Sequence, residues 1–265
     1  MSEMVLNMGK RIIFCNCGGD RISQERLQDI ENNLIDYNAE LIKLSDLCGL
    51  AALDRERLAT IFRGAEEYMI IGCHSRSLKL LLGQANVEVN NHSFHYANFL
   101  ESSDEDLFKK VSEFLINNDQ PSTFKEDKAD SSWPSWYPVI DYTRCSACGQ
   151  CADFCLFGVY QKSEGRVNVI KPAECKNNCP ACARICPQTA IIFPKYKQGG
   201  AIGGSDSIDE VSEQKRQAID INNLPDGDIY SALEQRKHKR KSIITEEAMK
   251  KALEERSGDM NKQYR

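Results

Sequence analysis

Two short runs, CSACGQCADFC at residues 145–155 and CKNNCPACARICP at residues 175–187, decide how the middle of this chain folds. The first run has the spacing Cys-x2-Cys-x2-Cys-x3-Cys, and the second has Cys-x3-Cys-x2-Cys-x3-Cys-Pro. A loop this tight wraps three irons of a cubane, and the fourth iron takes its thiolate from elsewhere. The runs therefore predict two [4Fe–4S] clusters, and because so small a segment buries little apolar core, the metal supplies much of its folding energy.

The spacing also assigns the ligands. In two-cluster proteins of this pattern the last cysteine of each run ligates the cluster of the other run. The first predicted set is Cys145, Cys148, Cys151 and Cys186, and the second is Cys175, Cys179, Cys182 and Cys155. Structural zinc is the alternative, but four-cysteine zinc sites use two Cys-x2-Cys pairs separated by a longer spacer. The compact runs favour clusters.

On these two runs, residues 138–196 resemble the bacterial 2[4Fe–4S] ferredoxin family. The resemblance implies a small α+β ferredoxin-like domain that carries electrons. The segments VIDY at 139–142 and AIIF at 190–193 flank the runs, and we expect them to pair as a short sheet. Two departures are present: Leu156 follows Cys155 where the family commonly has proline, and the second run has one residue more in its first spacer. Neither removes a ligand.

Before the cysteine runs, segments of strand and helix character alternate. This alternation predicts parallel βαβ units, and hence an α/β parallel-sheet domain at the N-terminus. The predicted strands are 11–14, 40–44, 67–71 and 93–96, and the predicted helices are 24–36, 55–62, about 78–82 and 104–116.

The four remaining cysteines are placed close after these strands: Cys15, Cys17, Cys48 and Cys73. In a parallel sheet the carboxyl ends of the strands meet along one edge, where ligands bind, so we expect the four thiols to converge. Four thiols are the number that one [4Fe–4S] cluster needs. Pattern alone leaves two other interpretations open: buried cysteines acting as small hydrophobic residues, or a redox-active thiol site without metal.

Three segments resemble the N-terminal domain of the flavin-containing polypeptide of heterodisulfide reductase: IFCNCGG at 13–19, IIGCHSR at 70–76 and FHYAN at 94–98. They are similar to that family's opening Cys-x-Cys-Gly strand and loop, its Cys-Ser-Pro-Arg strand end and its Phe-x-Phe-Ala-Asn segment. The resemblance implies a third cluster ligated by Cys15, Cys17, Cys48 and Cys73. Cys48 matches only loosely, and His74 and Ser75 stand where the family has Ser and Pro.

That family's central flavin domain has no counterpart in this sequence. No GxGxxG motif follows a strand, and the stretch between residues 120 and 138 is too short for a dinucleotide fold. The sequence therefore predicts no flavin or nicotinamide site, and what remains is a set of one-electron carriers.

The expected organisation is an α/β domain at 1–120, a polar linker at 121–137, the two-cluster domain at 138–196 and a charged, partly helical or disordered tail at 197–265. In the tail, GGAIGG (199–204) is interpreted as a flexible linker. Helical stretches are expected near 228–240 and 244–256. The basic run RKHKRK at 236–241 is either a solvated helix face or a docking surface for an acidic partner.

Composition narrows the class of function. The net charge of −5 argues against a general nucleic-acid-binding role. The sequence shows no signal peptide and no apolar run long enough to span a bilayer, which predicts a cytoplasmic protein without membrane insertion.

The predicted function is an electron-relaying subunit of an oxidoreductase complex of the heterodisulfide reductase type, with no catalytic residue of its own. Its expected partners are redox proteins that contain flavin or iron–sulfur centres. Near the third site, His74, Arg76 and Lys79 either raise a cluster's potential, orient a partner protein or form a solvated helix face. Two alternatives stay open: a thiol- or disulfide-reducing enzyme fed by the ferredoxin domain, and an iron–sulfur redox sensor.

Overall fold

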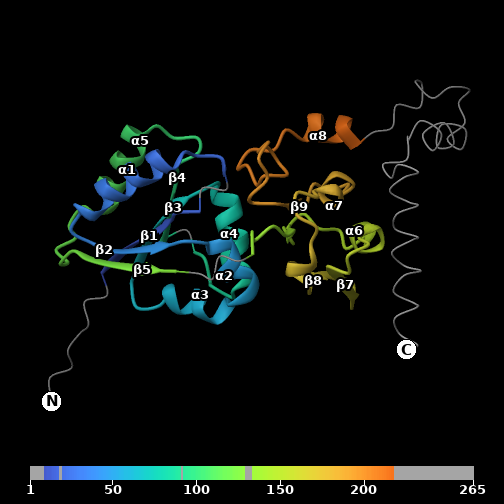
Figure 1. Cartoon of the computed structure of the whole chain (residues 1–265), viewed down its shortest axis with the longest axis horizontal. Helices are drawn as coiled ribbons and strands as arrows, with labels where there is room; N and C mark the ends of the chain where they lie inside the picture. The colour runs from blue at the N-terminus through green and yellow to red at the C-terminus, as the bar shows by residue number, and fades with distance from the viewer. Residues whose placement is uncertain (1–8, 18–19, 91, 129–132, 218–265) are drawn as a thin grey trace, which may run out of the picture. The chain divides into compact units, whose positions relative to one another are not determined.

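A five-stranded parallel sheet organises the first half of the chain (Figure 1). The computed structural model describes residues 9–17, 20–90, 92–128 and 133–217. The strands follow the order β4-β3-β1-β2-β5, and every neighbouring pair is parallel. Their bounds are β1 Lys10–Cys15, β2 Glu40–Leu44, β3 Glu67–Gly72, β4 Phe94–Asn98 and β5 Thr123–Asp127.

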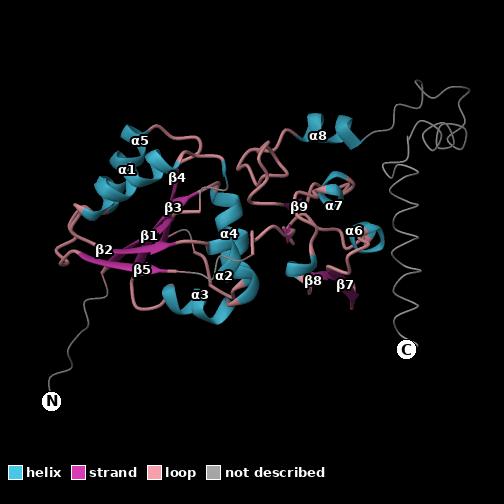
Figure 2. Cartoon of the chain, viewed as in Figure 1, coloured by secondary structure: helices cyan, strands magenta, loops and turns pink. Residues whose placement is uncertain are grey.

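Helices cover both faces of this sheet (Figure 2). One face packs against α1 (Gln24–Ile35) and α5 (Asp104–Phe114), and the other packs against α2 (Leu47–Leu53), α3 (Arg55–Ile61) and α4 (Ser75–Gln84). Side chains alternate along a strand. On β1, Ile12 and Phe14 therefore enter the core beneath α1 and α5, while Ile13 and Cys15 enter the core beneath α2–α4. Cys15 is thus directed to the face that carries α4.

The sequence-based prediction of an α/β parallel sheet is confirmed. The predicted strands correspond to β1–β4, and the predicted helices correspond to α1, α3, α4 and α5. Two elements of this parallel-sheet part of the chain were not predicted. Helix α2 has the sequence LCGLAAL, whose glycine and short length hide the helical period.

The second element that was not predicted, β5, lies within residues 121–137, for which the sequence predicts a linker. It pairs with β2 at the edge of the sheet. Its sequence, TFKED, is exposed at its first four positions, and Phe124 is its one apolar side chain. An edge strand that faces solvent carries neither an apolar run nor a clear alternation, so its composition resembles that of a loop.

The cysteine-rich segment contains only short elements. The expected pairing of 139–142 with 190–193 is confirmed for two residues of each segment, where β6 (Val139–Ile140) is antiparallel to β9 (Ile191–Ile192). A second hairpin joins β7 (Tyr160–Ser163) to β8 (Arg166–Val169) through Glu164 and Gly165, both with positive φ. The helices are α6 Gln150–Phe154 and α7 Ala181–Arg184, with a 3₁₀ turn η2 at Pro172–Glu174.

The glycine-rich stretch 199–204, interpreted from sequence as a flexible linker, is instead packed. Ala201 and Ile202 are buried, and the Phe193 N–H donates to the Ile202 carbonyl oxygen at 2.7 Å. A Cβ atom on Gly204 would overlap the Ser77 hydroxyl on α4. Glycine here permits close approach of the two segments. Beyond it lies α8 (Glu210–Gln217), whereas the predicted helices near 228–240 and 244–256 and the basic run at 236–241 lie outside the described residues.

Contacts join the sheet to the cysteine-rich segment within one unit, Met1–Gln217. Arg76 on α4 forms an ion pair with the buried Asp141 at 3.0 Å. The Asp206 carboxylate accepts hydrogen bonds from the Ser75 and Arg76 backbone N–H groups at 3.2 and 2.6 Å. A carboxylate at this position caps the first turn of α4 and favours its dipole.

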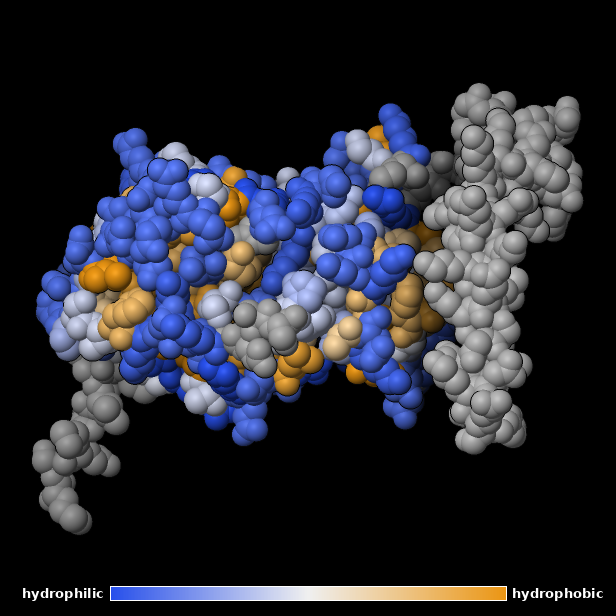
Figure 3. Space-filling model, in the orientation of Figure 1, coloured by the Kyte–Doolittle hydropathy of each residue, from blue (hydrophilic) through white to orange (hydrophobic). Residues whose placement is uncertain are grey.

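The surface is mostly hydrophilic on the face shown in Figure 3, with hydrophobic side chains in separate patches. Among the described residues, no helix combines the length and the apolar character that crossing a bilayer requires.

We expect Leu58→Ala in α3 to lower the free energy of unfolding by about 2–5 kcal/mol, because it leaves a cavity in a close-packed core. Leu58 is completely buried, whereas Leu53 in α2 is 61% exposed. The matched control Leu53→Ala should change stability by less than about 0.5 kcal/mol. Urea titrations under anaerobic conditions, followed by far-ultraviolet circular dichroism, measure both. Equal midpoints for the two variants would contradict the described core.

Candidate metal centres

Three pockets of the described chain each collect four cysteines, and each set of four is one that the sequence predicts. We call them the N-terminal site, site 1 and site 2. Their cysteines are, in that order, Cys15, Cys17, Cys48 and Cys73; Cys145, Cys148, Cys151 and Cys186; and Cys155, Cys175, Cys179 and Cys182. In sites 1 and 2 the last cysteine of each run lies with the other run, as the crossed spacing predicts.

The N-terminal site lies where the winding of the sheet changes direction. Strands β1 and β3 are neighbours, but the helices that follow them, α1 and α4, cover opposite faces. Such a switch point opens a crevice beyond the carboxyl ends of the two strands. Cys15 ends β1, Cys73 follows β3, and Cys48 lies in the first turn of α2. The topology therefore brings together thiols that are far apart in sequence.

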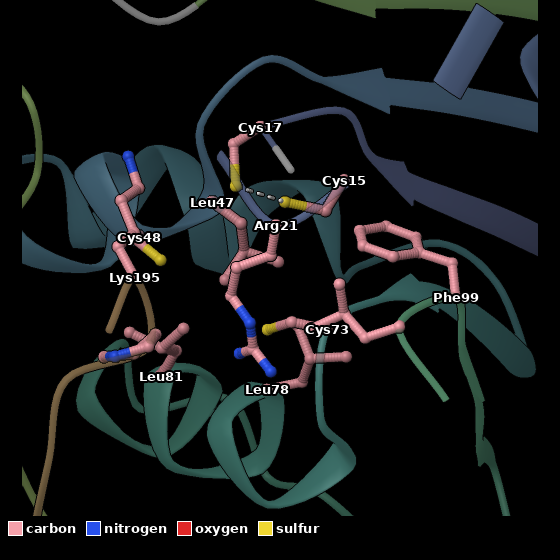
Figure 4. A pocket seen from close by; sticks show the side chains of 12 residues that line it. Cys15, Cys17, Arg21, Leu47, Cys48, Cys73, Leu78, Leu81, Phe99 and Lys195 are labelled. Atoms are coloured by element: carbon pink, nitrogen blue, oxygen red, sulfur yellow. Dashed lines mark hydrogen bonds between the residues drawn. The ribbon is translucent and has the colours of Figure 1, made fainter. Parts of the chain in front are cut away.

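The sulfur atoms of the N-terminal site face a common space (Figure 4). The Sγ atoms of Cys15 and Cys17 are 3.7 Å apart, and Cys15 and Cys48 are buried. The hydroxyl of the buried Tyr137 donates to the Cys48 carbonyl oxygen at 2.9 Å and fixes the backbone of that residue.

Without a bound cation, the thiols of the N-terminal site are difficult to deprotonate. The hydrogen bond with Cys17, together with burial, raises the pKa of Cys15 well above its ordinary value. Burial, with the nearby Cys15 as a smaller cause, raises the pKa of Cys73 to about 12. A bound cation reverses this effect, because a coordinating thiol loses its proton outright. The donor set is four sulfurs, with no carboxylate among the described lining residues, and it fits a soft metal or an iron–sulfur cluster.

Two cations, Arg21 and Lys195, line the N-terminal site, and the sequence interpretation did not find either of them. Lys195 Nζ lies 3.1 Å from Asp46 Oδ1 and donates to the Pro134 carbonyl oxygen at 3.1 Å. Burial would lower the pKa of Lys195, but Cys48, Cys17 and Asp46 together raise it, so the side chain stays cationic. No sequence pattern connects Lys195 with this site, because it follows β9 in the cysteine-rich segment.

The three basic side chains that the sequence singled out do not line the pocket. His74 is buried beside it, with Nε2 2.9 Å from Arg21 Nη2. Arg76 is paired with Asp141, and Lys79 Nζ lies 5.1 Å from the centre of the Tyr96 ring. The solvated helix face describes Lys79, which is exposed on α4, but not the buried His74 or the paired Arg76.

Site 1 has an uncharged lining. Its described lining residues include no Asp, Glu, Lys or Arg. The Ala190 N–H donates to Cys186 Sγ at 3.3 Å, the kind of hydrogen bond that tunes a ligating sulfur. Ala147 and Gly149 adopt φ of +56° and +81°, which turns the chain tightly between successive cysteines. Burial raises the pKa of Cys151 to about 11.

Site 2 has an apolar rim that faces solvent. Phe154, Leu156 and Phe157 line it and are 51%, 92% and 43% exposed. Asn178 takes the left-handed conformation, φ +59°, in the enlarged spacer between Cys175 and Cys179. Asparagine tolerates this conformation better than most residues, so the additional residue is accommodated without moving a cysteine out of the set. Asp153 and Lys176 are its charged lining residues.

Comparison with known proteins gives two relatives, both uncharacterized ferredoxins of Methanocaldococcus jannaschii. One is 50% identical over 64 residues, which is 24% of this chain and 44% of the relative. The other is 33% identical over 61 residues, which is 22% of this chain and 79% of the relative. The chain thus spans less than half of the first relative and most of the second. No family model matches the chain, and no solved structure matches it.

Proposed function

Because this chain belongs to the ferredoxin family over the part that matches, we propose that it transfers electrons through iron–sulfur clusters. The observation that carries the proposal is the sorting of all twelve cysteines into three pockets of four. Four thiolates are the ligand set of one [4Fe–4S] cluster, a one-electron carrier.

Sites 1 and 2 would hold the two clusters of a bacterial-type ferredoxin module at 138–196. Each pocket combines three cysteines of one run with the last cysteine of the other, which is the crossed ligation of two-cluster ferredoxins. The buried side of each site, at Cys151 and Cys182, would limit the access of water, and hydrogen bonds to sulfur would tune the potentials.

The N-terminal site would hold a third cluster, ligated by Cys15, Cys17, Cys48 and Cys73. The support is its position at the switch point, its four-sulfur donor set and the similarity of its strands to the flavin-containing polypeptide of heterodisulfide reductase. The chain would then relay electrons within a complex of that type, between partners that contain flavin or iron–sulfur centres. A cytoplasmic location is part of the same proposal and rests on the sequence alone.

Tyr137 and Pro138 connect the N-terminal site to site 2. The Tyr137 hydroxyl is hydrogen-bonded to the backbone of Cys48, and the next residue, Pro138, lines site 2. One hydrogen bond and one short piece of chain therefore join the surroundings of two centres. The chain's own contribution to electron transfer is to hold the sites in this order and to keep water away from them.

A thiol- or disulfide-reducing enzyme is the second candidate, and the 3.7 Å separation of the Cys15 and Cys17 sulfurs favours it. The raised pKa of Cys15 opposes it, because the thiolate is the attacking species. An iron–sulfur sensor would be expected to bind nucleic acid through a basic surface, and the basic run at 236–241 lies outside the described residues.

Iron and acid-labile sulfide analysis of anaerobically purified protein tests the proposal. Three cubanes predict about twelve irons per chain, at four per cluster. About eight irons would eliminate the third cluster and leave the ferredoxin module. Zinc in place of iron would contradict the whole proposal.

A further inference from the structure

The three sites differ in the charges that line them. The described lining of the N-terminal site contains two cations, Arg21 and Lys195, and no acidic residue. The lining of site 1 contains no charged residue, and in site 2 Asp153 and Lys176 balance each other. A cluster bound by four thiolates is anionic and gains a further negative charge on reduction, so a nearby cation stabilises the reduced form more than the oxidised form.

Lys195 is fixed in place beside the sulfurs. Its ammonium group is held by the Asp46 carboxylate and the Pro134 carbonyl, and its side chain is only 18% exposed. Figure 4 shows the Lys195 side chain alongside Cys48, with Arg21 on the side of Cys73. Charges held this way act through a partly dehydrated interior, where solvent screens them less than at the surface.

Asp46 opposes Lys195 at one of the sulfurs. Its carboxylate oxygen Oδ1 lies 3.1 Å from Lys195 Nζ, so its negative charge offsets part of the positive charge that the lysine brings to the pocket. Asp46 is itself fixed by a short hydrogen bond from the Ser135 hydroxyl. The charges at the N-terminal site therefore come from Arg21, from Lys195 of the cysteine-rich segment and from Asp46, the residue at the start of α2.

We propose that Lys195, assisted by Arg21 and opposed by Asp46, raises the reduction potential of the N-terminal site above those of sites 1 and 2. This inference rests on the proposed third cluster. In the relay, a flavin- or iron–sulfur-containing donor is oxidised as it passes one electron at a time to sites 1 and 2. Each electron then moves to the N-terminal site, which is reduced as the donating site is reoxidised. The N-terminal site is thus the electron-accepting end, and Lys195 is a positioning residue that sets the direction.

An anaerobic redox titration of the full chain, monitored by electron paramagnetic resonance, tests this inference. The signal of the N-terminal centre is identified as the one that Cys48→Ala removes. Lys195→Met should lower the reduction potential of that centre by about 59 mV for a one-electron couple. At a fixed ambient potential, this shift corresponds to a tenfold fall in the ratio of reduced to oxidised centre. Asp46→Asn should raise this potential. Lys195→Arg keeps the positive charge, so its potential should equal the wild-type value.

The matched control is Lys197→Met, which makes the same charge change two residues away. Lys197 is exposed and pairs with Asp20, and it does not line the site, so the potential should stay at the wild-type value. Opposite shifts for Lys195→Met and Asp46→Asn separate an electrostatic effect from loosened packing, which would move both potentials in one direction.

Three results would overturn the inference. One is an unchanged potential in Lys195→Met at full iron content, and another is a shift of both variants in the same direction. The third is an N-terminal centre whose wild-type potential lies below those of sites 1 and 2. A wild-type chain with only eight irons would instead refute the third cluster on which the inference rests, so the two failures are distinguishable.

Discussion

Removal of iron is expected to unfold residues 138–196 while the parallel sheet stays folded. The cysteine-rich segment has one apolar cluster of its own, and two of its buried members are the cysteines Cys151 and Cys182. Its strands β6 and β9 contain two residues each. Structural metal sites in small domains contribute about 10–16 kcal/mol, measured for zinc, which equals or exceeds the net stability of most domains.

The stability of the parallel sheet depends much less on bound metal. It has an apolar core on each face, and the core beneath α1 and α5 contains no cysteine among its buried residues. Amide hydrogen exchange of the chelator-treated, anaerobic chain should show full protection in β1 and β3 and none in β6 and β9. Reconstitution with iron and sulfide should restore the lost protection. Protected β6 and β9 amides in iron-free protein would show that apolar packing alone holds the segment.

On the proposed count of three clusters with four irons each, Cys48→Ala is expected to reduce the iron content by about four of twelve atoms and to leave the two proposed ferredoxin centres intact. Cys48 is the ligand that the sequence supports least, and it lies in a helix that the sequence did not predict. Its burial next to Cys17, however, gives it a place in the four-sulfur set. Iron analysis with electron paramagnetic resonance of the reduced protein measures the loss.

Cys151→Ala is the matched variant in site 1, and it should remove a different signal together with about four irons. Because the two sites share no lining residue, the double variant should lose about eight. Full iron content in Cys48→Ala would assign this residue to the apolar core and not to a cluster.

The sequence predicts those parts of the protein whose hydrophobic pattern or cysteine spacing is contained in one short segment. Strands β1–β3 each contain a short apolar run between helical segments, and each cysteine run lies within one short segment of the sequence. Convergence of Cys15, Cys17 and Cys73 follows from a general property of parallel sheets. The features that were missed have other causes: β5 is a charged edge strand, and α2 contains a glycine.

Contacts between residues far apart in the chain could not be predicted from the sequence. Lys195 reaches the N-terminal site only through tertiary packing, and the 199–204 glycines permit close packing although their composition is that of a linker. The Lys195 side chain lies at a pocket formed by elements far away in the sequence, and the lack of a side chain at Gly204 lets the chain approach the distant helix α4. Reading neighbouring residues cannot reveal such a partner.

The contribution of Pro194 and Lys195 to the N-terminal site has a consequence for how the protein matures. During synthesis the ribosome releases Cys15, Cys17, Cys48 and Cys73 long before it releases these two residues. The nascent pocket therefore lacks one of its walls until the cysteine-rich segment has folded. If the site holds the proposed third cluster, an iron–sulfur assembly factor would have access to the four thiols in that interval and would insert the cluster before the chain closes over it.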